Sequence, residues 1–410
     1  MKVERKVLIP VEGESQPCID GHHYGVAIMQ VNTVYKSKVD VGLLQQYSEE
    51  VASDAMGRHF QRTSEDNGKT WSEPTLIYEP VETNEGVLRR GESALFLDEE
   101  KDAILQFYNL SLYPESRYTG DVGKLSRIFL RISRDGGETF GEPEQIIQKG
   151  FDQENWARDV FYGRNCIGIS FCAPIKTSNG KILLPVQRRP LLKVEPSNPY
   201  LIPLEAGCFI GEWRGDRLEW DLGELVKIDP RLSSRGLCEP TLAELCDGSI
   251  LMVCRGSNDT ITHMPGRKWC SISRDGGLTW SEPFAFRYDD GEPFFSPAAG
   301  SRLIRSSKNG KLYWIGNILK ENPRGNRPRY PLQIAEVDED KKAIIKETVQ
   351  VIEDRRKGDS PWVQFSNFRV YEDRETHEFV LTMARIQERS EKELTSPAYQ
   401  YRIKMEDSDD

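Results

Sequence analysis

A glutamate and an arginine that flank a predicted β-hairpin, Glu239 and Arg255, are the strongest candidates in this sequence for chemistry on an anionic ligand. Glu239 stands in Leu237-Cys-Glu-Pro-Thr-Leu242, and Arg255 follows 16 residues later, beyond the Asp247-Gly248 turn. A carboxylate can act as a general acid or base, and the planar guanidinium of arginine matches a carboxylate, sulfate or phosphate. The alternatives are a glutamate that caps a strand and an arginine on the surface.

Further candidates for ligand contact stand at or just before the starts of other predicted apolar strands. They are Arg90, Glu92, Arg158 and Arg329. Arg90 and Glu92 lie in Arg89-Arg90-Gly-Glu92, and Arg158 lies in Trp156-Ala-Arg158-Asp159. If these strands converge, the arginines favour an anionic ligand.

The charge balance and the hydropathy exclude two classes of partner. The chain has 55 Lys and Arg against 65 Asp and Glu, a net charge of −10, whereas a nucleic-acid-binding protein needs a basic surface. No run of 18 apolar residues is present, so we expect no membrane span; the best run, near Cys166–Ile175, is interrupted by Gly and Pro.

The cysteines and the N-terminal residues indicate the compartment and the absence of a metal. The eight cysteines form no CxxC pair and have no metal-ligand spacing, so we expect free thiols, no metal and no cofactor. A Cys246–Cys254 disulfide is the alternative. Residues 1–10 carry charges where a signal peptide would be apolar, so we expect a cytoplasmic protein, with a processed secreted form as the alternative.

Three segments repeat the pattern S-x-D-x-G-x-T-[WF], and they organise the chain. They begin at Ser64, Ser133 and Ser273, so their spacings are 69 and 140 residues, close to one and two units of 70. The Ser and Asp side chains can bond the backbone of a hairpin turn, and glycine tolerates a positive φ. We expect the aspartates to be structural.

A second pattern of strand, polar turn and strand recurs six times, near His23, Glu92, Ala173, Glu239, Pro297 and Phe365. Six units of about 65 residues, each with four short strands, predict a six-bladed β-propeller of antiparallel blades. We expect one domain over residues 1–405, closed by pairing of residues 400–404 with 5–9, and a disordered acidic tail at 406–410. Residues 45–55 are the one helix candidate, and two β-sandwiches are the competing architecture.

The three repeated turns are similar to the Asp boxes (BNR repeats) of the sialidase superfamily, and the resemblance covers nearly the whole chain. It implies a central pocket in which three arginines bind the substrate carboxylate, a Tyr–Glu pair supplies the nucleophile and an aspartate is the acid/base. Glu239 and Arg255 match the family's glutamate and second arginine in context, Arg329 resembles the next arginine, with Arg327 as a near alternative, and Asp54 the acid/base.

Two family motifs are absent from this sequence. The segment expected to hold the first arginine reads Gly21-His22-His23-Tyr24-Gly25, so we consider His23 a catalytic candidate, with His22 and Tyr24 as substrate contacts. The segment expected to hold the nucleophile reads Trp362-Val-Gln364-Phe365-Ser366, which places a phenylalanine at the nucleophile position and makes Gln364 a contact candidate.

Three functions fit these residues. The first is a sialidase-like exo-glycoside hydrolase for a carboxylated or sulfated sugar, in which Glu239, Asp54 and His23 handle protons without a tyrosine nucleophile and water attacks with inversion if the carboxylates leave room for it. The second is a lyase for a uronic acid, and the third is a propeller that binds a glycan without turnover.

Overall fold

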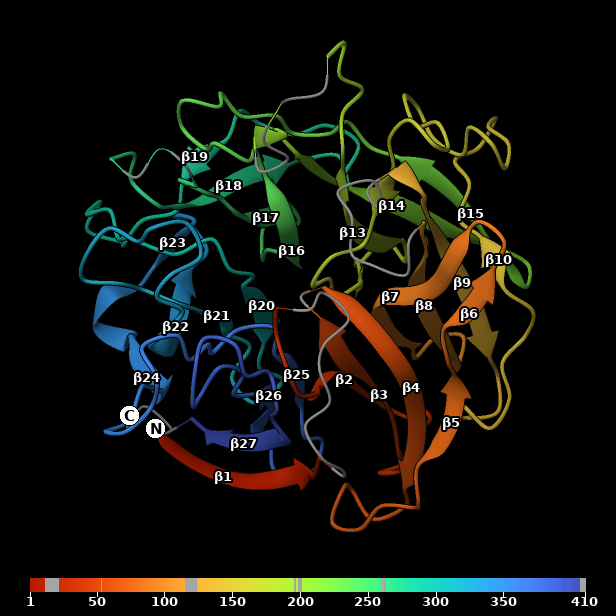
Figure 1. The fold of residues 1–410 in the computed structure, drawn as a ribbon, viewed down its shortest axis with the longest axis horizontal. Helices are drawn as coiled ribbons and strands as arrows, with labels where there is room; N and C mark the ends of the chain where they lie inside the picture. Colours follow the sequence, from red (N-terminus) through yellow and green to blue (C-terminus); the bar gives the residue numbers. More distant parts are fainter. Residues whose placement is uncertain are drawn as a thin grey trace.

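The structure is a computed structural model, and it describes residues 1–410 except 12–21, 53, 115–123, 195–196, 198–200, 260, 262 and 406–410. Six antiparallel sheets follow one another around a central axis, so the protein is the expected six-bladed β-propeller (Figure 1). The acidic tail and its predicted disorder lie outside the described residues.

The first three blades contain residues 27–222. Blade one is formed by β2 (Ala27–Tyr35), β3 (Leu43–Ala52), β4 (Ala55–Ser64) and β5 (Thr75–Tyr78). Blade two is formed by β6 (Val81–Thr83), β7 (Gly86–Asp98), β8 (Ala103–Tyr113), β9 (Ser126–Ser133) and β10 (Glu144–Gln145). Blade three is formed by β11 (Ile167–Gly168), β12 (Ile175–Lys176), β13 (Ile182–Arg188), β14 (Glu205–Arg214) and β15 (Arg217–Leu222).

The last three blades complete the ring. Blade four is formed by β16 (Cys238–Glu244), β17 (Ile250–Arg255), β18 (Lys268–Ser273) and β19 (Phe284–Ala285). Blade five is formed by β20 (Arg302–Arg305), β21 (Leu312–Gly316), β22 (Leu332–Asp338), β23 (Ala343–Ile344) and β24 (Gln350–Glu353), with the 3₁₀ turn η3 (Lys346–Thr348) before β24. Blade six is formed by β25 (Arg369–Glu372), β26 (Phe379–Ala384), β27 (Ala398–Lys404) and β1 (Lys2–Ile9).

The N-terminal strand closes the ring, as the sequence predicts. β1 pairs antiparallel with β27, with Lys2 opposite Lys404 and Arg5 opposite Tyr401. The first and last strands, β1 and β27, therefore lie side by side in Figure 1. In this arrangement the outermost strand of blade six is supplied by the other end of the chain, so the last blade forms only when both ends are in place.

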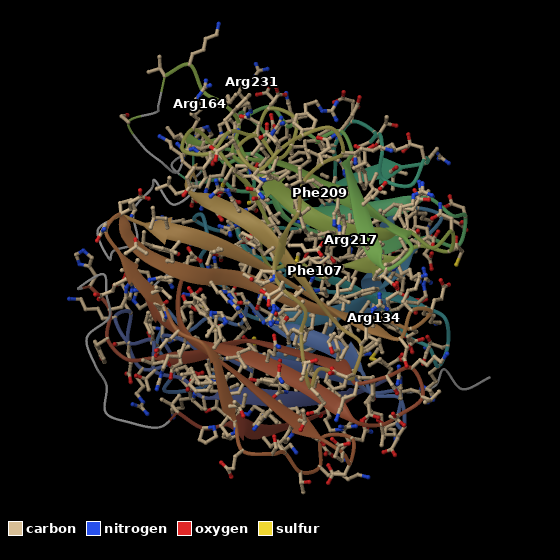
Figure 2. The ribbon with its side chains drawn as sticks, turned by 90° about the vertical axis from the view of Figure 1, so that its right-hand side faces the viewer. Phe107, Arg134, Arg164, Phe209, Arg217 and Arg231 are labelled. Carbon is tan, nitrogen blue, oxygen red and sulfur yellow. The ribbon has the colours of Figure 1, made fainter. Side chains whose placement is uncertain are left out.

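The core lies between neighbouring blades, where apolar residues on facing sheets pack together. Phe107 of blade two and Phe209 of blade three both contact the Trp220 ring edge-on, with ring centroids 5.9 and 6.5 Å apart. Figure 2 shows both phenylalanines between the stacked sheets, whereas Arg134 and Arg217 lie nearer the outside of the same blades. Aromatic packing of this kind holds each blade against the next.

The three repeated turns share one hydrogen-bond pattern. In the second copy the Gly137 N–H donates to Ser133 Oγ (2.8 Å), and the Thr139 N–H donates to the Asp135 carboxylate (2.9 Å). The Thr139 hydroxyl also donates to the Asp135 carboxylate, and this bond, together with those from the Thr139 N–H and the Ser133 hydroxyl, lowers the pKa of Asp135 to about 2. The aspartates are thus occupied by their own turns.

Two expectations about local structure can be compared directly with the fold. In the helix candidate at 45–55, residues 45–52 belong to β3 and Ala55 begins β4 instead, because the backbone of β3 pairs with β2 on one side and with β4 on the other. The cysteines within the described residues are free, including Cys246 and Cys254, as expected. Among the described residues no helix is long and apolar enough to cross a membrane.

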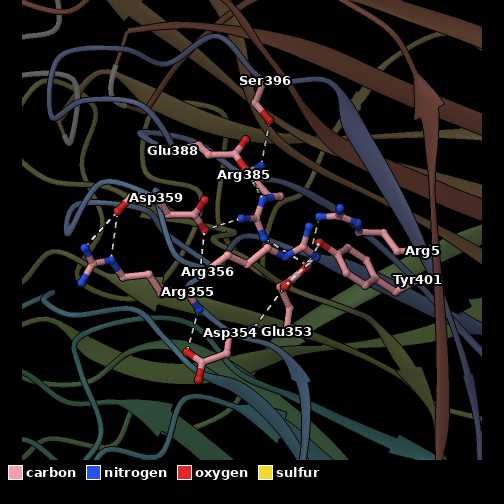
Figure 3. A network of polar contacts seen from close by, with 10 residues as sticks. All are labelled: Arg5, Glu353, Asp354, Arg355, Arg356, Asp359, Arg385, Glu388, Ser396 and Tyr401. Carbon is pink, nitrogen blue, oxygen red and sulfur yellow. Dashed lines mark hydrogen bonds and ion pairs between the residues drawn. The ribbon is translucent and has the colours of Figure 1, made fainter.

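A buried arginine network joins blade six to the closing strand (Figure 3). Arg385 is fully buried and contacts the carboxylates of Glu353 (3.1 Å), Asp359 (2.6 Å) and Glu388 (2.8 Å). Tyr401 of β27 and Arg5 of β1 also bond Glu353, at 2.9 and 3.2 Å. The Arg385 guanidinium also lies 4.8 Å from the centroid of the Phe365 ring.

We predict that Arg385→Met destabilises the protein by about 3–5 kcal/mol, because three carboxylates would lose their shared buried cation. The matched control is Arg389→Met: its side chain is 78% exposed and pairs only with Glu393, so we expect a loss below about 1 kcal/mol. Urea unfolding of the two variants measures the difference. Equal losses would show that the buried network does not stabilise the ring.

Candidate active site

One position recurs in every blade, within the inner strand in blades one, two and four and just before it in blades three, five and six. In each blade this position lies six residues before the first residue of the next hairpin turn, whose backbone N–H or carbonyl forms the hydrogen bond across that turn. These first turn residues are Lys36, Asp98, Thr177, Leu245, Ser306 and Asp373. The residues at this position are Gln30, Glu92, Phe171, Glu239, Gly300 and Asn367.

The backbone at this position is bulged. Four of the six residues have a φ between +47° and +57° although none of them is glycine: Gln30, Phe171, Glu239 and Asn367. Strand register also shifts at this point in β2, β7 and β16. A β-bulge bends the strand and re-aims one side chain, and here the same bend is repeated around the axis.

Side chains from blades that are not neighbours meet at the axis, and we call this group of residues the hub: Glu92, Phe171, Arg302 and Arg369. Phe171 of blade three packs edge-on against Phe368 of the opposite blade, with ring centroids 5.2 Å apart. Arg302 and Arg369 lie 4.6 and 5.1 Å from the centroid of the Phe171 ring, and Arg369 forms an ion pair with Glu92 at 2.8 Å. A Cβ at Gly300 would collide with Phe171, which explains the glycine there.

Glu239 and Arg255 form the ion pair that the hairpin spacing predicts. Arg255 at the end of β17 is opposite Cys238 of β16, and its guanidinium donates a hydrogen bond to Glu239 Oε1. Both side chains are about nine-tenths buried. Burial alone would raise the pKa of Glu239, but Arg255 and Arg329 hold it below its usual value, so the carboxylate is ionised at neutral pH.

Arg329 reaches the same place from blade five without a carboxylate in direct contact. It donates hydrogen bonds to Gln364 Oε1 (2.8 Å), Ser366 Oγ (3.1 Å) and the Ala298 carbonyl (3.0 Å). Burial and the positive charge of Arg255 lower its pKa to about 10, so it remains a cation at neutral pH. Neutral acceptors orient the guanidinium and leave its charge for an anionic ligand.

The residues around position 365 face the site differently from the sequence-based expectation. Phe365 is fully buried in the core of blade six, against the Tyr330 ring. Gln364 and Ser366, on either side of it, are the residues that contact Arg329. Side chains alternate along an extended segment, so the phenylalanine points away from the arginine and Gln364 points toward it.

A second carboxyl group, Glu50, joins the site beside Asp54, and the sequence analysis did not identify it. Asp54 is exposed at the β3–β4 turn, and its N–H donates to Glu50 Oε1 at 3.2 Å. Glu50 is buried, and its Oε2 has no hydrogen-bond partner. Burial and the neighbouring Asp54 raise its pKa to about 8, so it keeps its proton at neutral pH.

The acidic and basic residues affect one another across blades one, two, four and five. Asp54 acts electrostatically on Glu50, Glu92, Arg255 and Arg329, and Glu92 is raised in pKa by burial despite its ion pair with Arg369. We call these six residues the acid–arginine cluster: Glu50, Asp54, Glu92, Glu239, Arg255 and Arg329. Carboxyl groups whose pKa values are displaced in opposite directions are typical of acid–base sites.

A buried lysine, Lys268, holds the backbone segment that contacts Arg329 of the cluster. Lys268 of β18 pairs with Arg255 across the sheet, is fully buried, and donates to the carbonyls of Pro297 (3.0 Å) and Ala299 (2.5 Å). Burial lowers its pKa to about 7. Since Ala298 accepts a bond from Arg329, Lys268 fixes the segment that orients this arginine.

Two of the arginines that the sequence suggests as ligand contacts, Arg90 and Arg158, lie away from the acid–arginine cluster. The Arg90 guanidinium lies between the rings of Tyr78 and Tyr108, 4.5 and 4.4 Å from their centroids. Arg158 donates to the Leu222 carbonyl on the outer strand of blade three. The structure does not bring either of them to the acid–arginine cluster.

The segment with His22, His23 and Tyr24 lies beside the last loop of blade six. Tyr24 forms a bridge with Glu393, and its hydroxyl is 3.2 Å from Ser390 Oγ. His22 is exposed and His23 is half-buried. Among the described residues, no group of three or more His, Cys, Asp or Glu side chains is arranged to hold a metal ion.

The comparisons with known proteins agree with this architecture. A family profile described as the BNR repeat-like domain matches residues 59–377, and the chain belongs to this family. Comparison of the sequence with curated proteins gave no significant match.

Solved structures with the same fold include sialidases and another glycosidase. The NanB sialidase from Streptococcus pneumoniae superposes with a TM-score of 0.60 at 13% identity, covering 97% of this chain and 70% of that one. The intramolecular trans-sialidase from Ruminococcus gnavus gives 0.60 at 12% identity, covering 92% and 94%. The GH93 α-L-arabinofuranosidase of Fusarium graminearum gives 0.53 at 14%, covering 97% of both chains. The fold is therefore that of sialidase-like glycoside hydrolase propellers.

We predict that Glu50→Gln becomes more stable relative to the wild type as the pH rises from 5 to 8. The unfolded chain releases the Glu50 proton near the ordinary pKa of 4.5, whereas the folded protein holds it to about 8, so wild-type stability falls across this window. Urea unfolding at both pH values measures the change.

The matched control is Ser48→Ala, which alters a buried polar side chain on the same strand without removing an ionisable group. Its stability difference from the wild type is expected to be equal at pH 5 and pH 8. A Glu50→Gln difference that is equally independent of pH would contradict a protonated Glu50.

Proposed function

We propose that this protein is an exo-glycoside hydrolase that binds an acidic sugar, carboxylated or sulfated, at the acid–arginine cluster. The observation that carries the proposal is the meeting of Glu239, Asp54 and Glu50 with Arg255 and Arg329, contributed by blades one, four and five. Glycosidases use paired carboxyl groups, and arginines select an acidic group on the sugar.

The two arginines bind the acidic group of the sugar. Arg329 has only neutral hydrogen-bond partners, and Gln364 holds it in position. Arg255 is shared with Glu239, so a second anion would lie beside the Glu239 carboxylate. This arrangement places the sugar next to the ionised carboxylate.

The carboxyl groups divide the proton chemistry between them. Glu239 is ionised and acts as the base toward water, or stabilises the positive charge that develops on the sugar ring in the transition state. Asp54 is exposed, so a leaving group can reach it, and Glu50, which accepts a hydrogen bond from the Asp54 N–H, is the carboxyl that retains a proton at neutral pH. We therefore assign proton donation to the Glu50–Asp54 pair.

A tyrosine nucleophile is not part of this proposal. Phe365, which the resemblance to the sialidase superfamily places at the nucleophile position, is buried in the core, and Gln364 and Ser366 contact Arg329. His23 remains a further acid–base candidate. The similar folds of a sialidase and an arabinofuranosidase support a glycosidase.

The proposal predicts hydrolysis of an aryl glycoside of sialic acid, glucuronic acid or a sulfated hexose, with release of the aryl group. Glu239→Gln and Asp54→Asn are each expected to lower kcat at least about 100-fold, and Arg329→Gln to raise KM about 10-fold or more. The rate should fall above pH 8 as Glu50 loses its proton, and Glu50→Gln should remove this limb of the profile.

The control is Glu65→Gln, which removes an exposed carboxylate that pairs with Lys36 and is not part of the acid–arginine cluster. It is expected to retain wild-type activity. An unsaturated uronide product that absorbs in the ultraviolet would replace the proposal with a lyase. Saturable sugar binding without turnover would replace it with a glycan-binding propeller.

A further inference from the structure

Arg302, at the start of β20, is buried, and no carboxylate among the described residues forms an ion pair with it. Its side chain is 3% exposed, and one of its guanidinium nitrogens donates to the Cys172 carbonyl at 3.3 Å. The other terminal nitrogen, Nη1, is buried and has no hydrogen-bond partner. A buried cation with an unpaired donor is costly unless something accepts that hydrogen bond.

The neighbouring charges leave an excess of one positive charge. Arg369 occupies the same position in blade six as Arg302 in blade five, two residues beyond the bulge, and both stack on Phe171. Glu92 is the one carboxylate among the described residues that pairs with Arg369, and it makes no ion pair with Arg302. Two guanidinium groups and one carboxylate therefore share the hub.

A second donor in the same connected group also lacks an acceptor. Arg369 donates to Asn32 Oδ1 (3.0 Å), and Asn32 in turn donates to the backbone carbonyl of Gln30 (2.9 Å). The side-chain nitrogen of Gln30, Nε2, is buried and unpaired. The unpaired groups on Arg302 and Gln30 are both N–H donors, so what is missing from this part of the hub is an acceptor.

We propose that the hub binds a small monovalent anion, chloride in solution, at Arg302 Nη1. An anion accepts the unpaired hydrogen bond and also cancels the excess positive charge, whereas a water molecule would do only the first. A monatomic ion is the smallest acceptor of negative charge, and it therefore suits the buried guanidinium of Arg302 beside Phe171. The hub shares Glu92 with the acid–arginine cluster but does not include Arg255 or Arg329, and the anion site does not depend on the proposed hydrolysis.

Thermal unfolding of the full chain tests the proposal. The Tm is measured in sodium chloride and in sodium gluconate at equal ionic strength, with the salt concentration varied. Chloride is expected to raise the Tm by about 2 °C or more in a saturable manner, because an ion that binds only the folded state stabilises it. Equal Tm values in the two salts at every concentration would overturn the proposal.

Variants locate the effect. Arg302→Met keeps the apolar length of the side chain and is expected to lose the difference between chloride and gluconate. The control is Arg131→Met: Arg131 also stacks on an aromatic ring, Phe140, and donates only to backbone carbonyls, but it lies outside the hub. It should keep the full chloride effect, and a chloride effect that survives in Arg302→Met would contradict the site.

Bromide provides a direct readout in the wild-type protein, should Arg302→Met fail to fold. Crystals grown in sodium bromide are expected to show an anomalous peak within about 3.5 Å of Arg302 Nη1. A peak absent from the hub, or density there without anomalous signal, as for water, would overturn the proposal.

Discussion

Charged side chains from opposite and alternate blades are forced together at the propeller axis, where each must find a partner because little water reaches it. Arg369 of blade six pairs with Glu92 of blade two, and both arginines beside Phe171 approach a residue of blade three. Pairing of buried charges in the hub is the constraint on which the neighbouring acid–arginine cluster depends. The repeated bulges of the inner strands are the backbone feature that satisfies it.

The acid–arginine cluster is built on that frame by groups whose environments differ. Glu239 is ionised because Arg255 and Arg329 face it, while Glu50 keeps its proton because it is buried and because its neighbour Asp54 is another carboxylate. Two further residues orient Arg329. Gln364 accepts a hydrogen bond from it directly, and Lys268 holds the backbone on either side of Ala298, whose carbonyl also accepts from Arg329. Both residues are glutamates, so it is the surroundings of each carboxyl group that make one the base and the other the acid.

The sequence predicts the ring well because its signals are local. Turn spacing yields six blades and the strand that closes them, and a hairpin of known length brings Arg255 back to Glu239. Charges buried by contacts between separate parts of the chain have no local signal, and for this reason Lys268, Arg302 and Arg369 were missed. Glu50 was missed because its segment has helical periodicity, and the direction of Arg90 depends on a bulge at the next two residues that composition does not reveal.

A crystal structure with an acidic monosaccharide, such as sialic acid or glucuronic acid, tests the central claim most directly. The account predicts the carboxylate of the sugar within hydrogen-bond distance of Arg329 and Arg255, with Glu239 on one side of the ring and Asp54 on the other. A sugar bound away from these residues, or bound with its carboxylate toward solvent, would contradict the assignment of the acid–arginine cluster as the active site.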